Sequence, residues 1–229
     1  NDVRIELRIA HGRVGTDVRQ ANGRQHVVYE RRARDAHPWS APDHVADPQQ
    51  RAPLPRGCRH ALMGGAMSWV SEHRLVAAIS NAGGFGVLAC GSLGPAELRQ
   101  EIAGTKALTD RPFGVNLITM HPLLDDLIEL CMTERISHVV LAGGVPPTAA
   151  IRRIKDSGGK VMCFAPALGL AKRLIRNGVD ALIIEGAEAG GHIGPVATSV
   201  LAQEILPQIS EVPVFVAGGI GRGEAIVSY

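Results

Sequence analysis

Residues 185–194, Glu-Gly-Ala-Glu-Ala-Gly-Gly-His-Ile-Gly, combine residue types that are suited to acid–base chemistry beside a flat ligand. They follow an apolar run at residues 181–184, which has the length of a buried parallel strand. The glycines let the backbone come close to a ligand, and they place His192 at the end of that strand. Because imidazole titrates near neutral pH, His192 can take a proton from a substrate and return it. The alternative is an ordinary glycine-rich turn with a surface histidine.

Two further glycine turns follow apolar runs. Residues 217–220, Ala-Gly-Gly-Ile, place Gly218 and Gly219 where a helix should begin, so their N–H groups are candidates for one half of a phosphate site. A packing turn is the alternative. Residues 64–69, Gly-Gly-Ala-Met-Ser-Trp, offer a backbone edge to a flat ring, and the alternative there is a tight turn with Trp69 packed in the core.

Asn116 is a polar residue at the end of an otherwise apolar run, so we expect its amide to have a specific partner, either a ligand or a neighbouring loop.

The apolar run that contains Asn116 is one of seven that are typical of strands, and segments with helical spacing separate them. The pattern predicts parallel strands with crossover helices. The strands are expected at residues 60–63, 86–90, 113–118, 139–142, 160–164, 181–185 and 212–217, and the helices at residues 72–81, 95–103, 122–132, 148–157, 167–177 and 198–209.

Glycine-rich turns after nearly every strand favour a TIM-type (β/α)8 barrel over an open sheet. A closed barrel needs an eighth strand, so we expect an α/β fold of this type that is truncated after the seventh strand. Such a barrel would leave two strand edges free, which favours association into a homo-oligomer.

The composition agrees with an α/β protein. Of 229 residues, 45% are hydrophobic but only 3% aromatic, and 27 are glycine. The formal net charge of +2 gives no reason to expect a nucleic-acid or membrane partner. The 4 cysteines are widely spaced, without the spacing of a metal or redox site, and are expected to be reduced and mostly buried. No apolar run is long enough for a membrane span, so the predicted location is cytoplasmic.

Residues 1–56 differ from the rest of the chain. They are rich in arginine and proline, hold no lysine, and show no helical or strand periodicity long enough for a core element. We therefore divide the chain into residues 1–56, a disordered or non-native leader, and residues 57–229, an incomplete barrel. A basic contact patch at residues 31–34 is the less favoured alternative.

Five motifs occur in an order and spacing that resemble the nitronate monooxygenase family, formerly called 2-nitropropane dioxygenases. Close relatives of that family are the FMN-dependent enoyl-[acyl-carrier-protein] reductases. The resemblance covers residues 57–229 and implies an FMN-containing TIM barrel. The motifs are residues 63–70, 81–86, 108–116, 185–194 and 217–220.

The resemblance also implies roles for individual residues. His192 matches the family's catalytic histidine, while Gly218 and Gly219 would hold the FMN phosphate through their N–H groups. The family completes that phosphate site with a Gly-Thr pair after the eighth strand, and it carries a smaller helical domain; neither is found in these 229 residues. The residues expected beside the flavin itself are Ala66, Met67, Ser68, Asn116, Glu185, Gly190 and Gly191.

The implied enzyme is a flavin-dependent oxidoreductase that oxidises alkyl nitronates with O2 to a carbonyl compound and nitrite, with His192 as the base. One alternative is an FMN- and NAD(P)H-dependent reductase of enoyl thioesters, because residues 190–194 occur in that branch as well. The other is an inactive truncated fragment of either enzyme.

Overall fold

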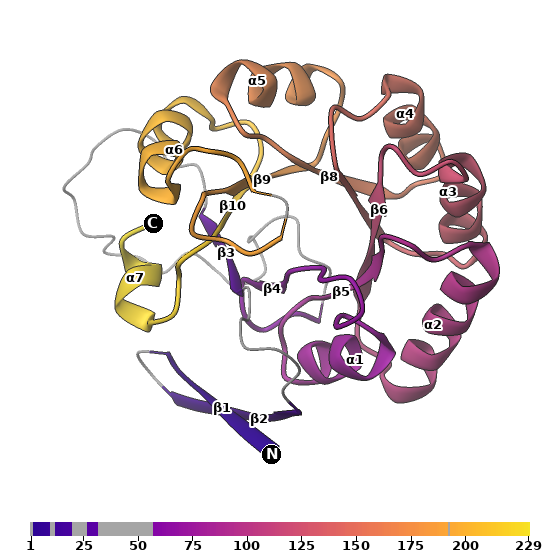
Figure 1. The fold of residues 1–229 in the computed structure, drawn as a ribbon, viewed down its shortest axis with the longest axis horizontal. Coiled ribbons are helices and arrows are strands. Elements are labelled where there is room, and N and C mark those ends of the chain that lie inside the picture. The colour runs from indigo at the N-terminus through magenta and orange to yellow at the C-terminus, as the bar shows by residue number, and fades with distance from the viewer. Residues whose placement is uncertain (1, 10–11, 20–26, 32–56, 192) are drawn as a thin grey trace.

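A curled sheet with helices around its outer side forms the centre of the protein (Figure 1). The structure is a computed structural model, and it describes residues 2–9, 12–19, 27–31, 57–191 and 193–229. Among these residues, no helix has both the length and the apolar character needed to cross a membrane.

Six strands of the sheet run parallel and follow one another around the curve. A seventh, β4 (Leu62–Gly64), joins the first of them through a parallel bridge between Met63 and Phe85. All seven predicted strands are present, and the curled parallel sheet agrees with a truncated TIM-type barrel. The six parallel strands are β5 (Gly86–Cys90), β6 (Phe113–Ile118), β7 (His138–Ala142), β8 (Lys160–Phe164), β9 (Ala181–Glu185) and β10 (Val214–Ala217).

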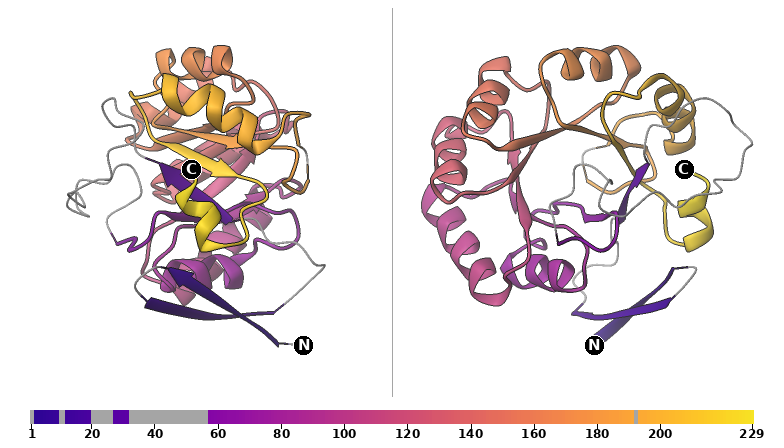
Figure 2. Two further views of the ribbon diagram at one scale, coloured as in Figure 1. Left: turned by 90° about the vertical axis from the view of Figure 1, so that its left-hand side faces the viewer. Right: turned by 180° about the vertical axis from the view of Figure 1, so that it is seen from behind.

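The edges of β4 and β10 are not free, contrary to expectation. An antiparallel strand, β3 (Val27–Arg31), pairs with both of them and lies between them in the sheet. Two more strands, β1 (Asp2–Ile9) and β2 (Gly12–Arg19), form a separate antiparallel pair outside the ring of helices (Figure 2). These three strands fall within residues 1–56, whose nature as a disordered or non-native leader stays a prediction.

Helices follow the strands as predicted, with two differences in their ends. Helix α2 continues beyond residue 103 because Gly104 packs closely against His73 of α1, where it serves as a contact point and not as a stop. The helix expected at residues 198–209 divides at Leu206, because Pro207 has no N–H to donate and restricts the residue before it. The helices are α1 (His73–Asn81), α2 (Pro95–Leu108), α3 (Leu124–Thr133), α4 (Thr148–Asp156), α5 (Leu168–Arg176), α6 (Thr198–Ile205), the 3-10 turn Leu206–Gln208 and α7 (Gly223–Val227).

Alternate side chains of each strand enter two separate cores. In β9, Leu182 and Ile184 pack in the core between sheet and helices, whereas Ala181 and Ile183 pack in a core inside the curve of the sheet. This alternation places the last residue of β9, Glu185, on the inner side. The inner core consists of Met63, Phe85, Val87, Val140, Met162, Ala181, Ile183, Phe215 and Ala217.

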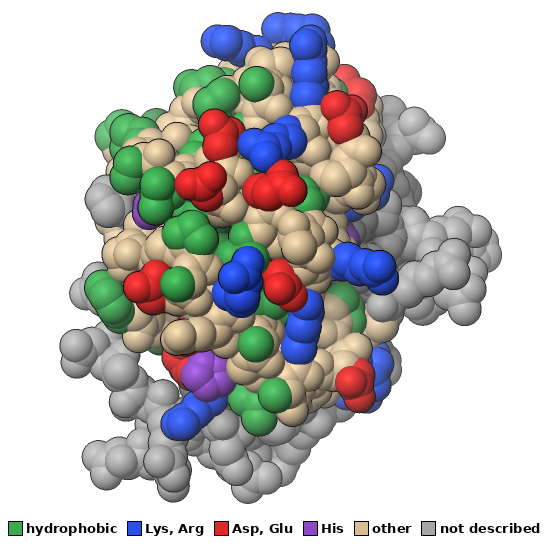
Figure 3. Space-filling view, turned by 90° about the vertical axis from the view of Figure 1, so that its right-hand side faces the viewer, with side chains coloured by type: hydrophobic (Ala, Val, Ile, Leu, Met, Phe, Trp, Pro, Cys, Tyr) green, Lys and Arg blue, Asp and Glu red, His purple; other side chains and the backbone are tan. Residues whose placement is uncertain are grey.

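The outer surface of the helices mixes both signs of charge. On the face that Figure 3 shows, basic and acidic side chains lie next to one another. Ion pairs account for part of this mixing: Lys106 lies 2.7 Å from Glu134, and Arg153 lies 2.6 Å from Glu129. These pairs connect neighbouring helices, and exposed pairs of this kind contribute little to stability.

Candidate active site at the carboxyl ends of the strands

Asn116 lies on the inner face of β6, since Val115 and Leu117 on either side of it belong to the outer core. It is only 7% exposed. Its backbone pairs in the sheet, but its side chain forms no hydrogen bond with any residue that the structure describes. A buried amide normally has a partner, because leaving it without one costs about 1–3 kcal/mol. An unpaired amide at this place fits a site that a ligand completes.

Glu185 ends β9 on the same inner side and is half-buried. Within the described part of the chain, its carboxyl has no hydrogen bond and no ion pair. Burial raises the pKa of this carboxyl from its ordinary value of 4.5 to about 7. Near neutral pH, a large fraction of Glu185 is therefore uncharged and can donate a hydrogen bond as well as accept one.

The turn between β4 and α1 holds three of the predicted flavin contacts. Its shape depends on Ser71, whose hydroxyl accepts a hydrogen bond from the Met67 N–H at 3.0 Å and donates one to the Gly65 carbonyl at 3.1 Å. Ala66 packs against the inner core, and Ser68 is exposed. The turn thus runs from the inner core to the surface.

Trp69, in the same turn, is 82% exposed and has a φ of 66°. The alternative that it packs in the core is therefore wrong. A large residue in left-handed backbone is strained, and such strain concentrates at functional sites.

The turn after β9 contains the residues that the sequence predicts to carry the acid–base chemistry. Gly190 is half-buried, and Gly191 is exposed with a φ of 85°. A side chain at Gly191 would have no atom of the described residues within 4 Å, its chain neighbours aside, so a glycine is favoured there by the backbone conformation and not by close packing. His192 lies outside the described residues, and its role as the base stays a prediction.

Gly218 and Gly219 follow β10 and have φ values of 104° and 71°. Gly218 is buried against Thr198 and Ala189, whereas Gly219 is exposed. An open hollow of about 700 Å³ lies beside them, lined by Gly219, Gly221, Arg222, Glu224 and Ala225. Backbone N–H groups in such a glycine turn, next to an arginine, are suited to an anion such as phosphate.

A hydrogen-bonded joint that the sequence did not predict holds these two turns together. Glu188 Oε2 accepts hydrogen bonds from the Thr198 N–H at 2.8 Å and the Thr198 hydroxyl at 2.9 Å. The same hydroxyl lies 3.2 Å from the Gly218 carbonyl oxygen and 3.3 Å from that of Ala217. The backbone hydrogen bond from Thr198 contributes most to lowering the pKa of Glu188. No local signal relates residues 188 and 198, because the contact depends on the path of the loop.

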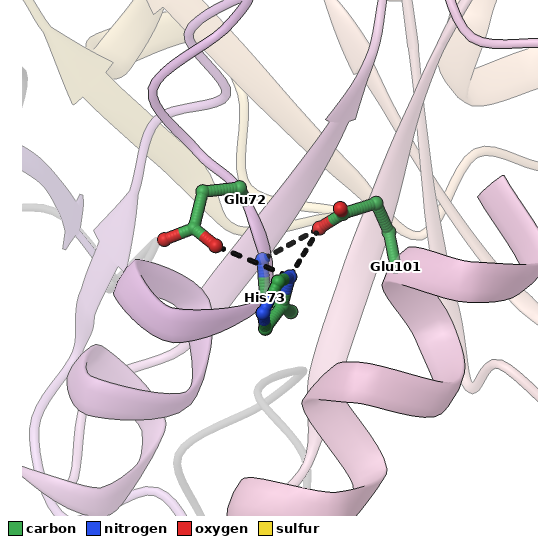
Figure 4. A group of neighbouring side chains, drawn as sticks. All are labelled: Glu72, His73 and Glu101. Atoms are coloured by element: carbon green, nitrogen blue, oxygen red, sulfur yellow. Dashed lines mark hydrogen bonds and ion pairs between the residues drawn. The ribbon is translucent and has the colours of Figure 1, made fainter. Parts of the chain in front are cut away.

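A second group of polar side chains lies outside the sheet, between α1 and α2 (Figure 4). His73 Nδ1 is 3.1 Å from Glu72 Oε2 and 3.0 Å from Glu101 Oε2. Their ligand atoms are close enough together to share a metal ion. Each carboxylate already has a structural use, since Glu72 caps α1 through the N–H groups of Arg74 and Leu75, and Glu101 accepts the His73 N–H. The positions of these three side chains are therefore explained by the contact that they form between α1 and α2.

The cysteines have no catalytic environment. All four are free thiols, three of them buried, as predicted. Burial raises the pKa of Cys163 to about 12, which keeps the thiol protonated and unreactive at neutral pH.

The protein-family model described as "Nitronate monooxygenase" matches residues 56–129 and 124–228. The chain belongs to the nitronate monooxygenase family. The predicted resemblance to this family is confirmed.

Two relatives of this chain carry names that describe different reactions. One is (3aS,4S,5R,7aS)-5-hydroxy-7a-methyl-1-oxo-octahydro-1H-indene-4-carboxyl-CoA dehydrogenase of Mycobacterium tuberculosis, 39% identical over 76% of this chain and 51% of its own length. The other is the nitronate monooxygenase of Paraburkholderia phytofirmans, 27% identical over 78% of this chain and 62% of its own length. The chain thus spans about half to two thirds of these curated relatives.

Solved structures show the same family likeness. FabK from Thermotoga maritima superposes with a TM-score of 0.64 and 40% identity, over 66% of this chain and 48% of that one. Nitroalkane oxidase from Streptomyces ansochromogenes superposes with a TM-score of 0.61 and 25% identity, over 66% of this chain and 56% of that one.

Proposed function

We propose that this chain is the FMN-binding part of an oxidoreductase that oxidises alkyl nitronates with O2 to a carbonyl compound and nitrite. The observation that carries this proposal is the buried amide of Asn116, which faces the inner side of the sheet without a partner among the described residues. Parallel strands end on one side, so the turns after β4, β9 and β10 open toward the same end as this amide.

The residues at this end fit FMN in two places. Asn116 can hydrogen-bond the polar edge of the flavin ring, with Ala66, Met67 and Ser68 along its face and residues 190–191 nearby. The N–H groups of Gly218 and Gly219 can hold the phosphate, where Arg222 adds a positive charge. When bound, FMN would supply the electron-transfer chemistry that amino-acid side chains lack.

The chain's own residues would manage the proton. His192, as a neutral imidazole, would hold or remove the proton on the carbon that bears the nitro group. Glu185, uncharged in large part near pH 7, would donate a hydrogen bond toward the ligand without adding a full negative charge to the site.

A second candidate is a reaction on an acyl thioester, which includes the enoyl thioester reduction considered above. One specific observation favours it. Identity reaches 39% with the CoA dehydrogenase of M. tuberculosis and 40% with FabK, but only 27% with the nitronate monooxygenase of P. phytofirmans. The geometry of the described residues suits both reactions.

The deciding experiment uses the purified 229-residue chain with added FMN. We expect a bound-flavin absorption spectrum and O2 uptake with propyl-2-nitronate. His192→Ala should reduce the uptake about a hundredfold or more, the usual contribution of a general base, whereas His60→Ala, in the segment before β4, should leave it unchanged. Flavin reduction by NADH and turnover of crotonyl-CoA, without nitronate-dependent O2 uptake, would favour the thioester reaction. A chain that binds no flavin would contradict both.

A further inference from the structure

Three separate segments meet at Thr198, the first residue of α6, which is 1% exposed. A side chain at Gly186, just after β9, would collide with the Thr198 N and Oγ1 atoms. A side chain at Gly218, just after β10, would come within 2.8 Å of Thr198 Oγ1 and 3.1 Å of the Ala189 N atom. Both turns are therefore packed against Thr198 without room for a methyl group.

Glu188 adds a charged hydrogen bond to this packing. Its carboxylate accepts the Thr198 N–H at the positive end of α6, where a negative group is stabilised by the helix dipole. That N–H is consequently not available to an external anion. The start of α6 therefore holds the turn after β9 in place.

The turn is also hydrogen-bonded to β10 and to the segment before α6. Gly186 N–H donates to the Ala217 carbonyl at 3.2 Å, and Ala187 N–H donates to the Val196 carbonyl at 2.9 Å. Glu188 itself is exposed, so solvent can replace its hydrogen bonds if the carboxylate is removed. The contribution of the Glu188–Thr198 hydrogen bonds can therefore be tested by substituting each of these two residues separately.

We propose that Glu188 and Thr198 are positioning residues that fix the turn at residues 186–191 relative to the Gly218–Gly219 turn. In this role they set the separation between the turn after β9 and the turn that the proposed function assigns to the phosphate. This inference rests on the proposed FMN site.

Hydrogen–deuterium exchange of the whole chain without flavin tests the joint directly. In Glu188→Ala and Thr198→Val, amides at residues 186–191 should exchange roughly tenfold faster, as expected when a charge-assisted hydrogen bond is lost. Thr198→Ser keeps the hydroxyl and should restore slow exchange. Glu211→Gln is the matched control, because Glu211 is another exposed glutamate with a hydrogen bond from a backbone N–H, that of Ser210.

A second measurement separates positioning from general stability. FMN affinity, followed by flavin fluorescence, should fall roughly tenfold in Thr198→Val and remain within about twofold of the parent in Thr198→Ser. Glu188→Gln keeps the side-chain volume and carries the test if Glu188→Ala does not fold.

Unchanged exchange at residues 186–191 in both Glu188→Gln and Thr198→Val would overturn the inference. Faster exchange spread evenly over α1 to α5 would overturn it too, since it would indicate a general loss of stability. The exchange measurement needs no ligand, so failure of the parent chain to bind FMN would contradict the proposed function alone.

Discussion

Two glutamates near the end of β9 have opposite surroundings. Glu185 closes the strand on the inner side of the sheet, half-buried and without a partner among the described residues, and burial raises its pKa to about 7. Glu188, in the turn that follows, is exposed, yet its carboxylate holds the Thr198 N–H and hydroxyl, and hydrogen bonding lowers its pKa.

The difference separates two kinds of polar group at this end of the barrel. Glu188 and Thr198 are satisfied by each other, which is typical of groups that position a loop. Glu185 and Asn116 face the interior without partners among the described residues, which is typical of groups that meet a ligand. Substitutions that act on one kind and spare the other test this division.

The largest loss of stability is expected where Gly186 packs against Thr198. Gly186→Ala would drive a methyl group into the backbone N atom of Thr198, a rigid neighbour, and should lower the free energy of unfolding by about 2 kcal/mol or more. Denaturant unfolding measures the loss. Gly194→Ala, in the same loop but with open space around it, should change stability little. Equal stabilities of the two variants would contradict the packing at Thr198.

The two glutamates should respond to pH with opposite signs. Between pH 4.5 and about 7, unfolded chains release the Glu185 proton and the folded protein keeps it, so this carboxyl increasingly destabilises the fold as pH rises. Glu185→Gln should therefore match the parent in acid and exceed its stability above pH 7, by about 1–2 kcal/mol because solvent partly screens this half-buried group.

Glu188 has a lowered pKa, so its contribution is present above the ordinary pKa of a glutamate and is lost as pH falls. Glu188→Gln should be less stable than the parent at neutral pH, and the gap should close in acid. Unfolding curves at several pH values measure both variants. If the stability of both variants relative to the parent changed with pH in the same direction, the contrast between Glu185 and Glu188 would be wrong.

Asn116→Leu should separate stability from ligand binding. Removing a buried amide without a partner is expected to stabilise the flavin-free protein by about 1 kcal/mol, while FMN affinity falls about tenfold. Denaturation and flavin fluorescence give the two values. Asn81→Leu is the control of opposite sign, because the Asn81 amide donates to the Leu108 carbonyl and accepts from the Thr109 hydroxyl. This variant should be less stable than the parent but should keep its affinity for FMN. An Asn116→Leu protein that is destabilised would indicate a protein partner for that amide.

The smallest effect is expected at Arg222, which is exposed beside the glycine turn. Arg222→Met should weaken FMN binding by about threefold, since exposed charges are screened by solvent. Riboflavin, which has no phosphate, should bind the parent and the variant equally. Arg176→Met at the end of α5 is the control. An equal loss of affinity for both flavins would place the phosphate elsewhere.

Much of the fold could be predicted because its signals are local. The bounds of β5, β6, β8 and β9 match the expected residue ranges, since largely apolar runs between polar, glycine or proline residues define them. The end of α2 was missed because Gly104 serves a helix contact there. The strand β3 was missed because residues 27–31 carry no periodicity of their own, and their partners lie far along the chain.

The amino-acid sequence alone determined the order of strands and helices, the family, and where along that order the candidate glycines, asparagine and histidine stand. Tertiary structure decided that Asn116 and Glu185 face inward without partners among the described residues and that Glu188 joins Thr198. It also placed β3 between β4 and β10. The physical reason is that strand and turn signals act over a few residues, whereas burial, pKa and hydrogen-bond partners depend on which distant segments the fold brings together.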